Sequence, residues 1–250
     1  MDYQLCLLFF LVAFIYSMAG FGGGSSYMAI MALYGVGMYT MKSTALLCNI
    51  VVVTNGVYNF YKQGFLPLKK ALWLSVASVP MAFIGSYIPL KEHVFFLVLG
   101  TSLVIASLLM FYRLLPLYSE KKKSTNNTSV YKFSVAGGFI GGLSGMTGIG
   151  GGIFLSPLLK LAHFDTAKNI AGLSSFFILV NSIAGLLGQV SRKQISLDYN
   201  FTIPLLLSVI VGGQIGTYLS AKKLNEKWVT IATAVLVGYA GARLLMNANA

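Results

Sequence analysis

Acidic side chains are scarce in this sequence. Only six of its 250 residues are Asp or Glu, charged residues of both signs make up 10%, and hydrophobic residues make up 56%. Soluble domains are about 45–50% apolar and about 25% charged, so we expect this chain to be embedded in a membrane. A carboxylate at the bilayer centre costs at least about 2.5 kcal/mol. The acidic residues fall at the edges of apolar segments, as that cost requires: Asp2, Glu92, Glu120, Asp165, Asp198 and Glu226.

Residues that serve most enzymes and metal sites are also few, with two cysteines and two histidines. Cys6 and Cys48 lie inside apolar stretches without metal-ligand spacing, and we interpret them as buried hydrophobic side chains. His93 and His163 have no carboxylate or cysteine at ligand spacing. The sequence contains no P-loop and no dinucleotide fingerprint. We therefore predict a protein that is not an enzyme and needs no metal or cofactor.

A net charge of +12 would suit a nucleic-acid-binding protein. The basic residues, however, form short clusters between apolar segments, as they do in the loops of membrane proteins. We therefore expect the lipid bilayer as a partner and no nucleic acid.

Six apolar segments approach the ~20 residues that a helix needs to cross a bilayer. They are residues 43–62, 71–90, 93–113, 169–190, 200–221 and 227–246. A polar stretch separates the third from the fourth. We divide the chain there into an N-terminal repeat (1–117), a linker loop (118–130) and a C-terminal repeat (131–250), which together form one membrane domain.

Two further apolar segments, 4–36 and 131–163, are interrupted by glycine. As single helices each would be about 50 Å long, too long for one crossing and too short for two. Each glycine costs a helix interior about 1 kcal/mol relative to alanine. We expect each segment to form two shorter helices that are broken at Gly20–Gly24 and at Gly148–Gly152.

The two halves resemble each other. Aligning Met18 with Met146 places four glycines of the first block on four of the second. A frame shifted by two residues then pairs identical residues: Lys42 with Lys168, Ala45 with Ala171, Asn55 with Asn181, and Gln63 with Gln189. Internal repeats are common in transporters, and we predict two homologous halves.

Two arrangements of these halves compete. If each glycine-broken segment crosses once, the chain has eight spans and parallel repeats, and Lys and Arg divide 11 to 7 between the two sides. If each segment enters and returns on one side, each half is a re-entrant helix pair plus three transmembrane helices, and Lys and Arg divide 13 to 5. The positive-inside rule favours the second arrangement. The predicted fold is an all-α polytopic protein of inverted repeats, multi-pass in the inner membrane, with both termini periplasmic.

The glycine turns are the candidate binding site. Re-entrant pairs entering from opposite faces would bring both turns to the bilayer midplane. The helix that begins after each turn, at Ser25 or Ile153, exposes unpaired N–H groups and partial positive charge, and glycine lets an anion approach the backbone. The predicted substrate-binding residues are Gly20, Gly22, Gly23, Gly24, Ser25, Ser26, Asn55, Thr147, Gly148, Gly150, Gly151, Gly152 and Asn181.

Other interpretations of these residues remain open. Glycines in membrane helices also serve close packing, although repetition at equivalent positions favours binding. Asn55 and Asn181 could equally form interhelical hydrogen bonds. We interpret Lys42 and Lys168 as anchors at the membrane interface rather than as residues that attract anions.

The repeated G-x-G-G-G blocks resemble the TauE/SafE family of sulfite exporters, also called the 4-toluene sulfonate uptake permease family. Gly20–Ser26 and Gly148–Pro157 carry the resemblance, although the first half has Met28 in place of Ser156-Pro157. It implies a secondary transporter that moves a sulfur oxyanion or organosulfonate by alternating access. An anion-selective channel and a non-catalytic membrane subunit of a larger assembly are the alternatives. The partners that we expect are a small anion as the substrate and, in a homo-oligomer, a second copy of the chain.

Overall fold

The computed structural model describes residues 3–18, 20–114, 130–219 and 226–248. These residues form α-helices and no strand. The first half contains α1 (Tyr3–Met18), α2 (Gly24–Leu33), α3 (Met38–Lys62), α4 (Leu68–Tyr87) and α5 (Glu92–Leu114). The second half contains α6 (Val130–Thr147), α7 (Gly152–Leu161), α8 (Ala167–Ser191), α9 (Tyr199–Leu219) and α10 (Glu226–Ala248).

Five of the described helices are long and apolar enough to cross a membrane: Met38–Lys62, Leu68–Tyr87, Glu92–Tyr112, Ala167–Ser191 and Tyr199–Tyr218. They correspond to five of the six predicted spans. The sixth, 227–246, lies in α10, whose described apolar part (Thr233–Met246) is shorter. The helix α4 ends three residues before the predicted span does, because Pro89 follows and Ile88 takes an extended conformation (ψ 124°).

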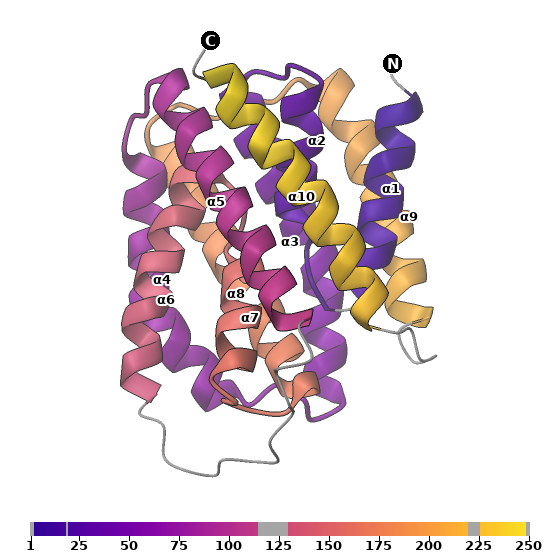
Figure 1. The fold of residues 1–250 in the computed structure, drawn as a ribbon, viewed down its shortest axis with the longest axis vertical. Coiled ribbons are helices and arrows are strands. Elements are labelled where there is room, and N and C mark those ends of the chain that lie inside the picture. Colours follow the sequence, from indigo (N-terminus) through magenta and orange to yellow (C-terminus); the bar gives the residue numbers. More distant parts are fainter. Residues whose placement is uncertain (1–2, 19, 115–129, 220–225, 249–250) are drawn as a thin grey trace.

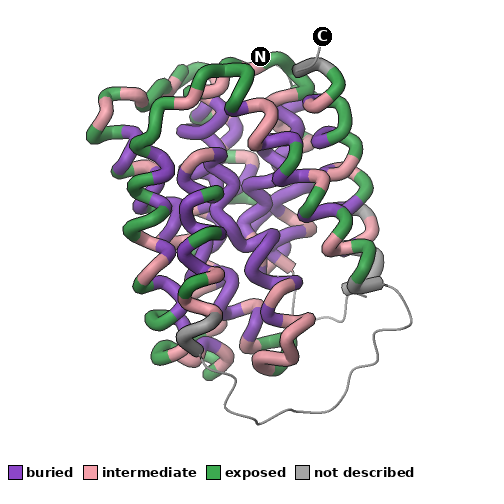
Figure 2. Tube along the Cα trace, turned by 60° about the vertical axis from the view of Figure 1, so that its left-hand side comes forward, coloured by how far each residue is buried: buried purple, intermediate pink, exposed green. Residues whose placement is uncertain are grey.

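The surface of the bundle suits lipid. Large apolar side chains are exposed along the helices, among them Tyr218 (85%), Phe139 (72%) and Val76 (64%). Figure 2 shows the buried residues along the middle of the bundle, with exposed residues on its flanks and at its ends. The chain is therefore a multi-pass membrane protein whose apolar residues face both the core and the bilayer.

The antiparallel helices α3 and α8 pack against each other. Near the start of α3, Ser43 donates a hydrogen bond to Gln189 Oε1 over 2.7 Å. Near its end, a Cβ on Gly56 would lie 3.7 Å from Ser175 Oγ. Residue numbers therefore increase along α3 in the direction in which they decrease along α8, so the two helices are antiparallel.

The other helices link the two halves. The broken pair α1–α2 packs through α1 on α9 of the second half, and the pair α6–α7 packs through α6 on α4 of the first. The helices α5 and α10 also pack together and are antiparallel, because Gly100 lies against Gly241 and Ser107 donates to the carbonyl oxygen of Ala234. Each half thus completes its core only against the other.

The start of α1 and the end of α10 lie at the same end of the bundle in Figure 1. We call this the terminal end; it also holds the start of α3 and the end of α8. We call the opposite end, where α3 ends and α8 begins, the far end. Lys70 at the start of α4 pairs with Asp165 before α8 at the far end, with 2.6 Å between Nζ and Oδ2.

Candidate functional site

Both glycine blocks break their helices. Gly23 (φ +83°) and Gly151 (φ +78°) are left-handed and precede the first residues of α2 and α7. These helices begin at Gly24 and Gly152, one residue before the predicted starts. A left-handed backbone costs residues with a Cβ about 1–2 kcal/mol. No side chain caps either helix, so their first N–H groups are left for another partner.

The two turns lie against each other, although more than a hundred residues separate them in the sequence. A Cβ on Gly24 would collide with the carbonyl oxygen of Ile149, which belongs to the second turn. Only glycine allows the backbones to approach this closely. The N-termini of α2 and α7 therefore belong to one site.

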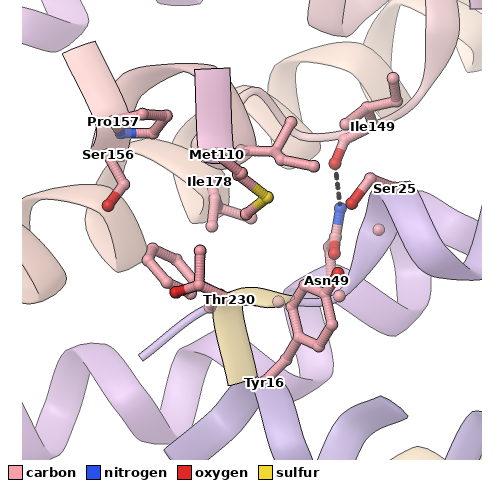
Figure 3. Close-up of a pocket in the computed structure, with 15 residues that line it drawn as sticks. Tyr16, Ser25, Asn49, Met110, Ile149, Ser156, Pro157, Ile178 and Thr230 are labelled. Carbon is pink, nitrogen blue, oxygen red and sulfur yellow. Dashed lines mark hydrogen bonds between the residues drawn. The ribbon is translucent and has the colours of Figure 1, made fainter. Parts of the chain in front are cut away.

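The side chain of Asn49, on α3, lies between the turns. It is fully buried, and its Nδ2 donates a hydrogen bond to the carbonyl oxygen of Ile149 over 3.1 Å (Figure 3). A Cβ on Gly22 would lie 2.5 Å from Oδ1, and one on Gly150 would lie 2.5 Å from Nδ2. Oδ1 accepts no hydrogen bond in the described part of the chain. Buried polar atoms usually have a partner, so this amide retains capacity for a ligand.

A pocket opens beside Asn49 and contains about 520 Å³ of empty space, part of it open to the outside. Both turns line it, together with helices from both halves (Figure 3). Its lining residues are Tyr16, Phe21, Gly22, Gly23, Gly24, Ser25, Asn49, Met110, Ile149, Gly152, Ile153, Ser156, Pro157, Ile178 and Thr230. Met110 lies near the end of α5 and Thr230 near the start of α10, so these walls belong to the far half of the bundle.

No carboxylate, lysine or arginine is among the described residues that line the pocket. No cluster of metal-ligating side chains occurs in the described ranges either. The polar groups at the pocket are main-chain amides, hydroxyls and the amide of Asn49. Its electrostatic character therefore depends on the two helix N-termini, each with about +0.5 charge.

Five of the predicted site residues line this pocket: Gly22, Gly23, Gly24, Ser25 and Gly152. Others lie just behind it. The hydroxyl of Ser26 bonds to that of Tyr16 over 2.6 Å, and Gly150 and Gly151 complete the second turn. Thr147 points its hydroxyl back to the carbonyl oxygen of Leu143 over 2.7 Å.

Four predicted residues lie farther from the lining. Gly20 (φ +78°) and Gly148 (φ +84°) begin the two turns and pack against other helices. Asn55 is half-buried and donates to Gln214 Oε1 on α9 over 2.9 Å. Asn181 is buried, and its Nδ2 donates to the carbonyl oxygen of Phe177 over 2.8 Å. Asn55 therefore makes the interhelical bond that was the alternative prediction.

Sequence reasoning missed Asn49, Tyr16, Met110 and Thr230. Asn49 is a mid-span amide like Asn55, six residues away on the same helix, and that signal was available. The other three are common residue types in apolar helices. Only the packing of α1, α5 and α10 brings them to the glycine turns.

Comparison with known proteins agrees with this architecture. Residues 5–244 match the family model "Sulfite exporter TauE/SafE". The chain is 31% identical over 241 residues to the probable membrane transporter protein y4hK of Sinorhizobium fredii, covering 96% of this chain and 97% of that protein. It is 28% identical over 132 residues to the probable membrane transporter protein MJ0441 of Methanocaldococcus jannaschii, covering 50% and 49%.

No solved structure matches the chain, so the arrangement of the site comes from this molecule alone. A helical bundle with several apolar spans and a full-length match to a transporter family is a membrane transporter for a small molecule, and not an enzyme. The chain belongs to the sulfite exporter TauE/SafE family.

Proposed function

We propose that this protein is a secondary transporter for a small anion, of the sulfur oxyanion or organosulfonate class. The observation that carries the proposal is the meeting of the uncapped N-termini of α2 and α7 at Asn49. The pocket beside them has no charged side chain in the part of its lining that the structure describes. Helix N-termini bind anions through free N–H groups and their partial charge. A site of this kind binds an oxyanion without holding it as tightly as a full cationic charge would.

The rest of the pocket narrows the substrate class. Met110, Ile153, Pro157 and Ile178 add apolar side chains to the pocket lining, beside the glycine turns. An organosulfonate has an oxyanion head, which would bind at the helix N-termini, and an apolar body, which would contact these side chains. An inorganic sulfur oxyanion would use the turns alone. The family's description favours sulfite.

We propose further that the halves are inverted repeats. The antiparallel packing of α3 on α8 supports this, as does the exchange of broken pairs, because α1 contacts α9 as α6 contacts α4. The start of α1 and the end of α10 lie at the same end of the bundle, which also fits two re-entrant pairs (Figure 1). Inner-membrane location, periplasmic termini and a cytoplasmic far end follow from the distribution of Lys and Arg.

Alternating access is favoured over a channel. A channel needs a continuous path, whereas buried side chains fill the bundle between the pocket and the terminal end, among them Phe95, Leu99 and Leu103 of α5 (each 0% exposed). A transporter with one closed side has to change conformation to release its substrate on that side.

The test is counterflow in proteoliposomes with sulfite, thiosulfate and sulfoacetate. We expect saturable exchange of at least one of these anions, and no exchange of a neutral analogue or a cation of similar size. Exchange that does not saturate would indicate a channel. If none of the anions moves, the proposed function is wrong.

A further inference from the structure

Identical residues that the repeat pairs with one another differ in burial. Lys42, Gln189 and Asn181 are 5%, 1% and 0% exposed. Their partners in the other half are open: Lys168 and Gln63 are exposed, and Asn55 is half-buried. Lys42 and Gln189 belong to the terminal end, and Lys168 and Gln63 to the far end. Packing therefore encloses these residues at the terminal end and leaves their counterparts open at the far end.

Lys42 is a buried cation without a counter-charge. Among the residues that the structure describes it forms no hydrogen bond and no ion pair. It makes a cation–π contact with Phe95, with 6.0 Å between Nζ and the ring centroid. Glu92, one turn before Phe95 on α5, is exposed and makes no ion pair with it. An unpaired ammonium in a bundle interior is unfavourable because it has lost its hydration, and an arriving anion would offset that loss.

The stem of Lys42 packs on the second glycine turn. A Cβ on Gly148 would lie 3.1 Å from the Cα of Lys42 and 3.4 Å from its Cγ. The stem of Lys42 therefore lies beside the turn whose next carbonyl, that of Ile149, accepts a hydrogen bond from Asn49. Any movement of this hairpin that opens the terminal end would uncover Lys42.

We infer that Lys42 is an anion-binding residue on the terminal half of the path, held without its ligand in this far-open state, and that Lys168 has the same role at the far end. The inference rests on the proposed function, since it needs an anionic substrate. It assigns a charged contact to each entrance, whereas the described lining of the pocket between them has none. Lys168, exposed and 4.7 Å from the ring of Phe65, is the member of the pair that is free to meet an anion in this state.

Vesicles of each orientation separate the two entrances. We would measure the KM for entry of the anion that the wild type carries, from the terminal side and from the far side. Lys42→Met is expected to raise the terminal-side KM about tenfold, as loss of a desolvated charge contact does, and to change the far-side KM less than about twofold. Lys168→Met is the matched control and should show the reverse pattern. Lys42→Arg should keep the terminal-side KM near that of the wild type.

A second measurement does not depend on flux. Sulfite should raise the Tm of the detergent-solubilised wild type more than that of Lys42→Met or Lys42→Gln, two variants that guard against a folding defect in either one. Equal KM values for wild type and Lys42→Met on both sides would overturn the inference while leaving the proposed function intact. An equal change on both sides would make Lys42 structural and also overturn it. A wild type that moves no anion would refute the proposed function as well.

Discussion

Gly23 and Gly151 show why single residues decide this site. Each is left-handed, and each would need to displace a neighbour to carry a Cβ. A Cβ on Gly23 would lie 2.9 Å from Val12 and from the ring of Tyr27, and one on Gly151 would lie 3.0 Å from Ile140 and Phe177. The absence of a side chain serves two purposes, because it permits the turn and leaves the helix N–H groups accessible.

Gly23→Leu and Gly151→Leu are expected to abolish transport. Each adds a side chain where the backbone has a positive φ and no space, which distorts the turn and covers the N–H groups. Counterflow of the anion that the wild type exchanges is the measurement, with membrane insertion checked by yield. Gly37→Ala is the control, because nothing lies within 4 Å of its Cβ position. Undiminished flux in either leucine variant would contradict the site.

Asn49→Ala should lower flux at least tenfold. The substitution removes the hydrogen bond to the carbonyl oxygen of Ile149 and a buried amide between the turns, and loss of such a group costs about 1–3 kcal/mol. Asn59→Ala is the control on the same helix, since Asn59 donates only to Asn55 over 3.3 Å. Equal flux in both variants would show that Asn49 has no part in transport.

At the scale of elements, α2 and α7 are ten residues each, about 15 Å at 1.5 Å per residue. They are half as long as a span, and both begin at buried residues inside the bundle. Non-helical backbone at that depth survives only where protein or a cavity surrounds it. Packing of α1 on α9 and of α6 on α4 supplies that surrounding.

The loop between α7 and α8 is attached to α4 through Asp165. Partial burial favours a higher pKa for Asp165, but hydrogen bonds from Lys70, the N–H of Thr166 and Asn169 outweigh it and lower the pKa from its ordinary value. A lowered folded-state pKa stabilises the fold above the unfolded pKa of about 3.9, and this contribution disappears as the pH falls through the folded value.

Asp165→Asn should therefore lower the Tm at neutral pH. The loss in free energy of unfolding should be less than about 1 kcal/mol, because Lys70 is part-exposed. Thermal unfolding in detergent between pH 7 and pH 3 is the measurement. The difference between wild type and variant should shrink below about pH 4. Lys69→Ala, at the neighbouring exposed position, should match the wild type at every pH. A pH-independent difference would contradict this account.

At the scale of the whole molecule, topology follows from the two broken pairs. A reporter fused after Ala250 should behave as periplasmic, and one inserted into the linker 118–130 as cytoplasmic, because the re-entrant arrangement puts three crossings in each half. Alkaline phosphatase and a fluorescent protein give opposite signals at the two positions. Signals that place both positions on one side would restore the eight-span parallel arrangement.

The sequence by itself determined the class of the molecule. Apolar segments of sufficient length, with acidic residues only at their edges, predict a helical membrane protein because buried charge is costly in lipid. Consecutive glycines likewise predict both helix breaks, since the backbone conformation there depends on the residue type itself. Helix ends followed to within five residues. The largest difference is at the start of α3, which begins at Met38 rather than at residue 43, and Pro89 ends α4 three residues early.

Tertiary structure alone decided which residues meet. The repeat predicted that Lys42 and Lys168 are equivalent anchors, but one is buried beside Gly148 and the other exposed, because a bundle closed at one end gives equivalent residues different surroundings. Asn49 rather than Asn55 lies between the turns. Which residue of α3 meets the turns depends on how deep the two broken helix pairs reach into the bundle. Periodicity fixes which residues share a helix, whereas contacts between distant segments depend on how the helices pack.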